Sequence, residues 1–509
     1  MKEFLLGEDH LTIEAFVAII NDQLTPSISE SAWKRVRQYR SIIDKTLAST
    51  ESVYGINTGF GFLSDVSIPE EDLETLQVNL VRSHACGVGP SVPDRVVKAL
   101  LILRLHTFCL GHTGISEDCV RHIQSFLQFR IFPVVPSKGS VGASGDLAPL
   151  AHLALGFIGE GDVSVDGVVK EASQALEELK LKPYGLKAKE GLSLINGTHF
   201  MTAIAAMVAE AASNLMTCSD IILALSLDAI RGTTRAFDDR IHRIRPQSGQ
   251  LEVAQNIRLL FEEKDEIQNS HKDCGKVQDP YSFRCAPQVH GASRDALRFV
   301  KGTLETELNS VTDNPLVFED GETISGGNFH GQPVSLAMDF LAIALAEIGS
   351  MSERRIEKLT NPNMSGLPPF VARESGVNSG FMIPHVVAAA LVSENKVLCH
   401  PASVDSIPTS ADKEDHVSMG PIAARKCESV LENVTDILAI ELLTACQGID
   451  LMQPLKPNKT LSAVYNKVRS VSPSMESDRS LHKDIKAVAK LVASGELRVI
   501  IDELGVKLS

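Results

Sequence analysis

The stretch from Gly139 to Leu150 (GSVGASGDLAPL) is the most unusual in the sequence. Its simplest interpretation is a turn of glycine and serine ahead of a helix, with Asp146 as the N-cap. A phosphate-binding loop is the second, although no lysine follows Gly145 and the pattern GxxxxGK[ST] is absent. The third is chemical. Because glycine lacks a Cβ, the Gly145 nitrogen can attack the Ala143 carbonyl, and loss of two waters, one of them the Ser144 hydroxyl, leaves a ring with an exocyclic methylidene. This cyclisation needs a tight, strained loop, and the tripeptide alone leaves the three interpretations open.

Composition narrows the class of protein that could use such a group. The 509 residues are 44% hydrophobic and 22% charged, which is ordinary for a soluble globular enzyme. Aromatic residues make up only 5%, and this scarcity favours packed helices over a β-sandwich. The net charge of −15 argues against a nucleic-acid partner.

Location and metal content can also be inferred from the sequence. The N-terminus turns acidic too early for a signal peptide, and no run of about 18 apolar residues predicts a membrane span. The nine cysteines form no CxxC pair, which indicates reduced thiols in a cytoplasm. His271 and Cys274 have a metal-like spacing but no second pair nearby, so we expect no metal site.

The hydrophobic pattern predicts a mainly helical fold in three segments. Residues 1–197 mix short helices with glycine-rich loops, residues 198–450 carry long Ala/Leu-rich helices, and residues 451–509 read as shorter, more charged helices. Broad apolar stripes on the long helices predict a bundle that associates into a homo-oligomer. Helices are expected at 30–48, 94–110, 201–230, 334–359, 384–398 and 423–446.

Seven sequence blocks together resemble one family, the aromatic amino-acid ammonia-lyases that carry a methylideneimidazolone group, and within it the histidine-specific branch. The resemblance covers nearly the whole chain, and the blocks follow the family's order. They are residues 54–61 (YGINTGFG), 79–87 (NLVRSHACG), 142–150 (GASGDLAPL), 190–198 (EGLSLINGT), 278–288 (QDPYSFRCAPQ), 326–330 (GGNFH) and 414–419 (EDHVSM).

The resemblance implies a fold, a prosthetic group and an assembly. The fold is a long-helix bundle of the ammonia-lyase and fumarase type, with an irregular N-terminal portion that carries the prosthetic-group loop. The prosthetic group is 4-methylideneimidazol-5-one, formed autocatalytically from Ala143, Ser144 and Gly145, with no metal or nucleotide. The family assembles as homotetramers whose sites combine residues of several chains.

Several matching positions are implied to handle the substrate. Tyr54 matches the catalytic base on a mobile lid, although its unperturbed pKa near ~10 requires a nearby cation or dipole. Arg284 matches the clamp on the substrate carboxylate, a task that suits a guanidinium fork. Taken singly, these residues would be a packed tyrosine and a surface arginine. The positions that hydrogen-bond the substrate or the prosthetic group are matched by Asn196, Gln278 and Tyr281.

Four further positions concern the substrate ring. Phe329 matches an aromatic wall beside the prosthetic group, and Met382 matches the pocket of histidine-specific members. His84 and Glu414 match the residues that recognise the ring, since an imidazole has both a donor and an acceptor nitrogen. The chain departs from the usual pattern at Asp412-Lys413 and Pro384-His385, which puts the fine shape of the pocket in question.

The expected function is non-oxidative elimination of ammonia from L-histidine to give trans-urocanate, the first step of histidine degradation. The alternative is a tyrosine or phenylalanine ammonia-lyase, or a 2,3-aminomutase with the same electrophile. A helical scaffold that has lost the chemistry is the non-enzyme alternative. The presence of Ser144, Tyr54 and Arg284 argues against a scaffold.

Overall fold

The computed structural model describes the chain except residues 1, 49–52, 54, 60–67 and 264. The described chain forms two compact units that interleave along the sequence. Unit 1 comprises Met1–Met207, Lys301–Met338 and Pro401–Arg425, and unit 2 comprises Val208–Val300, Asp339–His400 and Lys426–Ser509. The boundaries expected at residues 197 and 450 remain predictions about sequence character.

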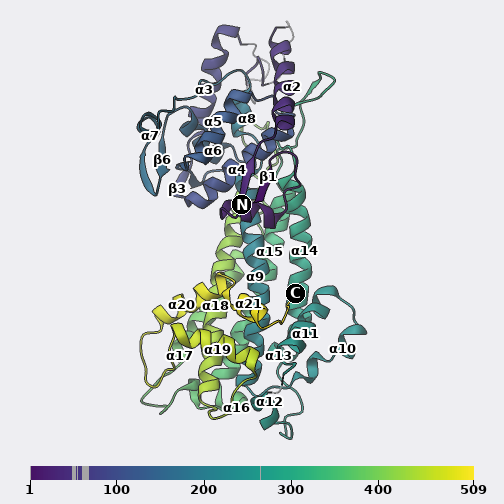
Figure 1. The fold of residues 1–509 in the computed structure, drawn as a ribbon, viewed down its shortest axis with the longest axis vertical. Helices are drawn as coiled ribbons and strands as arrows, with labels where there is room; N and C mark the ends of the chain where they lie inside the picture. Colours follow the sequence, from purple (N-terminus) through teal and green to yellow (C-terminus); the bar gives the residue numbers. More distant parts are fainter. Residues whose placement is uncertain (1, 49–52, 54, 60–67, 264) are drawn as a thin grey trace. The chain divides into compact units, whose positions relative to one another are not determined.

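Unit 1 contains helices α1 to α8 and all the short strands that the structure describes (Figure 1). The strands pair as β1–β2 (parallel), β3–β5, β4–β6–β7 and β8–β9. Their bounds are β1 Lys2–Leu5, β2 Leu24–Ser27, β3 Val88–Ser91, β4 Ile131–Pro133, β5 Pro136–Lys138, β6 Asp162–Val165, β7 Val168–Glu171, β8 Leu316–Val317 and β9 Thr323–Ile324. The helices are α1 Ile13–Ile20, α2 Glu30–Leu47, α3 Leu73–His84, α4 Asp94–Leu110, α5 Glu117–Gln128, α6 Leu147–Phe157, α7 Ala172–Glu178 and α8 Glu190–Ile195.

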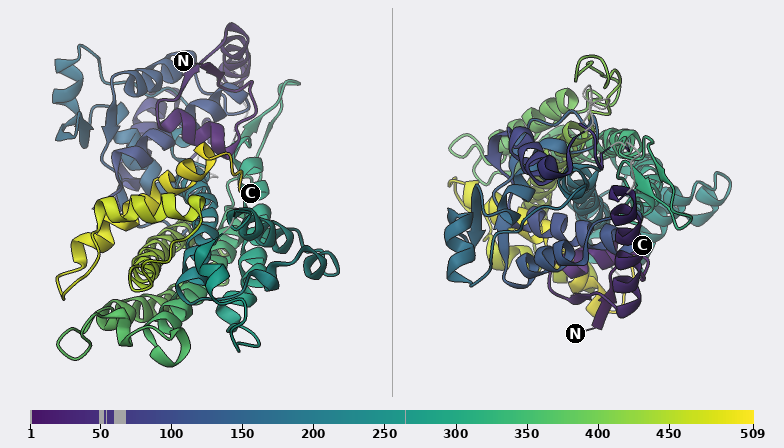
Figure 2. Two further views of the ribbon diagram at one scale, coloured as in Figure 1. Left: turned by 60° about the horizontal axis from the view of Figure 1, so that its bottom comes forward. Right: turned by 90° about the horizontal axis from the view of Figure 1, so that it is seen from above.

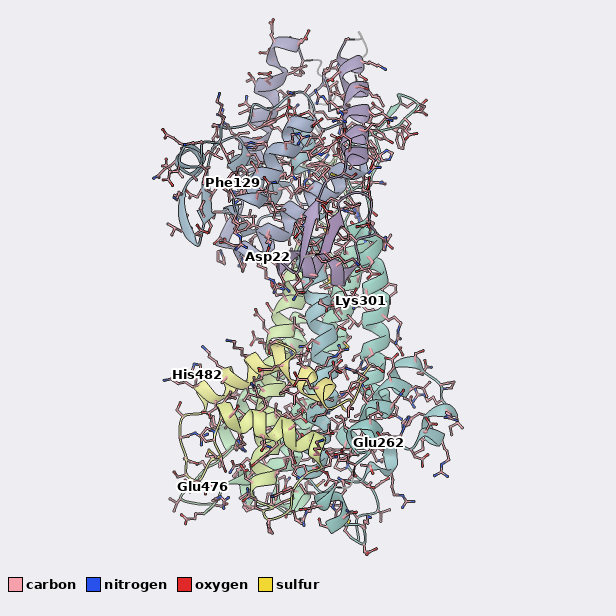
Figure 3. All side chains as sticks on the ribbon, in the orientation of Figure 1. Asp22, Phe129, Glu262, Lys301, Glu476 and His482 are labelled. Carbon is pink, nitrogen blue, oxygen red and sulfur yellow. The ribbon has the colours of Figure 1, made fainter. Side chains whose placement is uncertain are left out.

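The core of unit 1 surrounds α4, which is buried on nearly all sides. Helices α2 and α5 pack against it, while α3, α6 and α8 pack on one another. The loop of Ser144 leads directly into α6, and Asn196 ends α8. The packed helices therefore position the Ser144 loop and Asn196, which are expected to carry chemistry. At the surface, Asp22, labelled in Figure 3, pairs with Lys98 at 2.6 Å and with Arg130 at 3.0 Å.

Four long helices contribute residues to both units. Three of them correspond to predicted helical segments, with ends shifted by a few residues: α9 His199–Ala229, α15 Gln332–Thr360 and α18 Gly420–Asp450. The fourth, α14 Ala286–Leu308, was not predicted from the sequence. By length and composition, α9 and α15 could each cross a membrane, but 78% and 61% of their most apolar windows are buried inside the fold. Such burial is typical of core helices in soluble proteins.

The described residues of unit 2 form helices joined by loops, and no named strand lies among them. The expected helix at 384–398 is confirmed as α17, and the short C-terminal helices pack on one another (Figure 2). Both ring nitrogens of His271 lie near backbone carbonyl oxygens, of Ile267 at 2.7 Å and Gly232 at 3.0 Å. The remaining helices are α10 Asp239–Arg243, α11 Ser248–Leu260, α12 Glu266–Ser270, α13 Tyr281–Arg284, α16 Pro362–Ser365, α17 Met382–Leu398, α19 Lys459–Val471, α20 His482–Ala493 and α21 Glu496–Glu503.

Candidate active site

The Ala143-Ser144-Gly145 loop is held by backbone pairing to the turn at Gly197. The Gly197 nitrogen donates to the Ser144 carbonyl at 3.2 Å, and the Asp146 nitrogen donates to the Gly197 carbonyl at 2.8 Å. Gly145 has a φ of +81°, and a Cβ at this position would lie 2.1 Å from the Gly197 oxygen. Only glycine therefore fits at position 145, and its backbone remains free of side-chain obstruction.

Asp146 caps a different helix from the one expected. It occupies the N-cap position of α6 but makes no side-chain hydrogen bond there. Its Oδ2 instead accepts from the nitrogens of Phe200 at 2.8 Å and Met201 at 3.0 Å, in the first turn of α9. Burial raises the pKa of Asp146 to about 8. Its Oδ1 is buried and has no partner among the described residues. The carboxyl group thus ties the Ser144 loop to α9.

This carboxyl group should make stability depend on pH. An unfolded aspartic acid has a pKa of ~3.9. Since the folded pKa is about 8, the folded chain keeps a proton that the unfolded chain releases, and this lowers stability as pH rises between these values. Asp146→Asn keeps an acceptor for the α9 nitrogens and cannot titrate. Its free energy of unfolding relative to wild type should therefore increase with pH, by at most about 1.4 kcal/mol per unit. Denaturation at several pH values measures this, and a constant difference would contradict it.

Glu414 lies against Ser144. The Ser144 hydroxyl donates to Glu414 Oε1 at 3.3 Å. The other carboxylate oxygen accepts from Thr409 Oγ1 at 2.8 Å and Ser410 Oγ at 2.7 Å, within a tight turn. Two hydroxyls thus fix the carboxylate, and its Oε1 remains directed at the serine that the cyclisation would dehydrate. Asp412, one of the departures from the family pattern, occupies this turn with a φ of +65°.

The contacts of His84 determine which of its ring nitrogens can accept a hydrogen bond when the ring is neutral. It is half-buried at the end of α3, the helix that packs against α6 and α8. Its Nδ1 lies 2.8 Å from the Leu80 carbonyl oxygen. A carbonyl can only accept, so Nδ1 carries the proton of the neutral ring and Nε2 keeps a lone pair. In this tautomer His84 can bind an N–H group of a ligand through Nε2.

Phe329 belongs to a loop that contacts the Glu414 segment. Its neighbour His330 stacks on His416, with ring centroids 5.6 Å apart and planes 28° apart. His330 Nε2 also lies 3.3 Å from the His416 backbone oxygen. This contact brings the GGNFH and EDHVSM blocks together. The sequence suggested Phe329 but gave no reason to pair the two histidines.

Asn196 is buried and held by residues that the sequence did not suggest. Its Nδ2 donates to Asp313 Oδ1 at 3.2 Å and to the Asn314 carbonyl at 2.8 Å. Asp313 in turn pairs with Lys189 at 3.0 Å. Lys189 immediately precedes the EGLSLINGT block, but charged side chains are usually exposed, so its complete burial had no signal in the sequence.

The remaining predicted residues belong to unit 2. Tyr281 is exposed, and the Arg284 guanidinium lies over its ring at 4.4 Å from the centroid. Arg284 Nε also donates to the Asp279 carbonyl at 2.9 Å. Met382 is the first residue of α17, where Pro384 fits in the first turn. His385, the other departure there, pairs with Glu353 at 2.9 Å.

Gln278 lines a basic cavity of about 310 Å³ in unit 2. The cationic lining suits an anionic group such as a carboxylate. Tyr54, the predicted base, lies outside the described residues. The basic residues around the cavity are Arg231, Arg235, Lys272 and Lys276.

The chain matches a known protein family over most of its length. Residues 11–470 match the model of the family described as "Aromatic amino acid lyase". The chain belongs to the aromatic amino acid lyase family. A relative from Sorangium cellulosum named "Histidine ammonia-lyase" is 51% identical over 487 residues, covering 94% of this chain and 95% of the relative.

Solved structures of lyase family members have the same fold. The crystal structure of histidine ammonia-lyase from Trypanosoma cruzi has a TM-score of 0.91 and 45% identity, covering 99% of this chain and 95% of that one. Tyrosine aminomutase from Streptomyces globisporus has a TM-score of 0.92 and 36% identity, with 98% of each chain covered. The predicted helical ammonia-lyase fold is confirmed by these similarities, and the chain is a carbon–nitrogen lyase.

The lyase family uses a methylideneimidazolone group, and the loop geometry fits this group. Gly145 is restricted to glycine by the Gly197 backbone, and Ser144 is half-buried beside Glu414. The buried Asp146 Oδ1, without a partner among the described residues, lies next to the same tripeptide in sequence. The restriction to glycine at position 145 and the position of Ser144 beside Glu414 are therefore compatible with a ring formed from the chain itself.

Proposed function

We propose that this lyase eliminates ammonia from L-histidine to give trans-urocanate, the first step of histidine degradation, in the cytoplasm. The observation that carries the proposal is the contact between Ser144 and Glu414, because it joins the electrophile-forming serine to a carboxylate suited to an imidazole. The similarity of this chain to proteins named histidine ammonia-lyase, including one from Homo sapiens at 49% identity, supports the same substrate.

In the reaction a C–H bond at the β-carbon and the C–N bond break, and a C=C bond forms. The methylideneimidazolone derived from Ala143, Ser144 and Gly145 supplies the electrophile that activates the substrate for loss of ammonia. Tyr54 takes the β-proton, as the resemblance implies.

The other proposed roles concern binding. Arg284 binds the substrate carboxylate through its guanidinium, and Gln278 and Tyr281 hydrogen-bond nearby. His84 Nε2 and the Glu414 carboxylate can each accept a hydrogen bond from an imidazole N–H, a donor that a benzene ring lacks. Phe329 and Met382 provide the apolar walls of the ring pocket.

We also propose a homotetramer. The α17 surface in unit 2 exposes a series of large apolar side chains, which is typical of an interface. Sedimentation should give four times the chain mass, and a fully active monomer would contradict the assembly. The exposed residues are Ile383, Val386, Val387 and Val397, with exposures of 60%, 54%, 41% and 74%.

The second candidate function is a tyrosine lyase or aminomutase, favoured by the similarity to tyrosine aminomutase. Ultraviolet monitoring of wild-type enzyme with histidine, tyrosine and phenylalanine separates the two. Urocanate should form from histidine much faster than cinnamates form from the other two substrates. A faster reaction with tyrosine, or a β-amino acid product, would replace the proposed function.

A further inference from the structure

A buried ion pair in unit 1 has no obvious value for stability. Lys189 Nζ lies 3.0 Å from Asp313 Oδ2, and the two side chains are only 1% and 4% exposed. Lys189 also donates to the Thr113 carbonyl at 2.7 Å and to Ser193 Oγ at 3.0 Å. Burial lowers the pKa of Lys189, although Asp313 opposes this effect. Desolvating two charges often costs as much as their attraction returns. A contribution to stability therefore does not explain the pair, and we considered a role in function.

The other carboxylate oxygen of Asp313, Oδ1, holds the Asn196 side chain. Asp313 Oδ1 accepts from Asn196 Nδ2 at 3.2 Å and from the Asn314 nitrogen at 2.7 Å. Asn196 Nδ2 donates its second hydrogen to the Asn314 carbonyl at 2.8 Å. A flipped amide would place its oxygen against two acceptors, a carboxylate and a carbonyl, and the contact would become repulsive. The hydrogen-bonding groups thus permit one orientation only.

This orientation leaves the side-chain oxygen of Asn196, Oδ1, available to accept a hydrogen bond from a ligand. Its Oδ1 makes no hydrogen bond to any residue in the described part of the chain. The Asn196 backbone oxygen is also fixed, because Arg104 Nη1 donates to it at 2.9 Å. The next residue, Gly197, pairs with Ser144 and Asp146. A rigid acceptor therefore immediately precedes the turn that holds the Ser144 loop.

We infer that Lys189 and Asp313 are positioning residues that make Asn196 a hydrogen-bond acceptor for the α-ammonium group of the substrate. The ammonium group has only donors, whereas the carboxylate has only acceptors, so the orientation of the amide decides between them. This inference rests on the proposed function and adds to it the substrate atom that Asn196 binds.

Asp313→Asn tests the inference with little change of shape. The new amide can donate to Asn196, which frees Asn196 to turn its NH₂ group toward the ligand. KM for L-histidine should rise about 10- to 100-fold, the effect of one hydrogen bond to a charged group. The inhibition constant of 3-(imidazol-4-yl)propanoate, which lacks the amine, should stay within about two-fold of wild type. General loosening of the site would weaken both ligands equally.

The matched control is Asp450→Asn in unit 2, which removes the charge of another buried carboxylate, paired with Arg469 at 2.6 Å. It should leave unchanged the ratio of KM for L-histidine to the inhibition constant of 3-(imidazol-4-yl)propanoate. Ser193→Ala removes one hydrogen bond to Asp313, of 3.2 Å, and should shift the ratio in the same direction by less, even if Asp313→Asn does not fold. Equal weakening of both ligands in Asp313→Asn, or an unchanged ratio in a folded Ser193→Ala, would overturn the inference. A wild type that makes no urocanate would instead overturn the proposed function.

Discussion

Replacing Ser144 with alanine should reduce histidine turnover by about 10³-fold or more, because the side chain that forms the electrophile is gone. The fold should persist, since among the described residues the Ser144 side chain hydrogen-bonds only to Glu414, and its backbone pairing to Gly197 does not depend on the hydroxyl. Wild-type protein should have an intact mass about 36 Da below the sequence mass, the mass of two waters. The alanine variant should show no such deficit.

Ser41→Ala is a suitable control for this experiment. Ser41 is an exposed serine of α2 in the same unit, and its hydroxyl donates to the Gln38 carbonyl of the same helix. This variant should keep both the mass deficit and full activity. Peptide mapping that found unmodified Ala143-Ser144-Gly145 in active wild-type protein would refute the prosthetic-group proposal.

Substrate discrimination should depend on His84 and Glu414. A pocket built to pair polar substrate atoms rejects an analogue without them by ~10⁴-fold, because its own groups are left unsatisfied. Wild type should therefore prefer histidine to phenylalanine by about this factor in kcat/KM. Replacing both residues with leucine should reduce histidine turnover and relax the preference. The kcat/KM values for histidine, tyrosine and phenylalanine measure the effect.

Glu414→Gln distinguishes charge from shape in the same pocket. Glutamine can keep the contacts to Thr409 and Ser410 but carries no charge to orient an imidazole or accept its proton. It should lose much of the histidine rate without gaining phenylalanine activity. A double leucine variant that kept the wild-type histidine rate would rule out the assigned roles of both residues.

Local patterns in the sequence predicted much of the fold. The segment 94–110 is confirmed as α4 with the same ends, because its apolar residues and flanking Pro93 and Gly111 mark both boundaries. The long Ala/Leu-rich segments are confirmed as α9, α15 and α18. The Ala143-Ser144-Gly145 loop was singled out because its residue types are chemically unusual.

Contacts between distant segments could not be predicted in this way. Asp146 was expected to cap α6, but it caps α9, whose first turn is more than fifty residues away in sequence. Lys189 and Asp313 are 124 positions apart and meet only in the folded core. Single-sequence patterns report local periodicity, and a buried charge has the same local signature as an exposed one.

The close approach of Gly145 and Gly197 affects how mutational scans of this enzyme should be interpreted. Gly197 has no functional group, yet its φ is +102° and an added Cβ would lie 2.6 Å from the Thr312 carbonyl oxygen. Any side chain there would displace the turn that carries the Ser144 loop. Position 197 would then score like a catalytic position in an activity screen although it performs no chemistry. Intolerance to substitution at such a contact reports steric fit, so activity data alone would overstate the number of reacting groups.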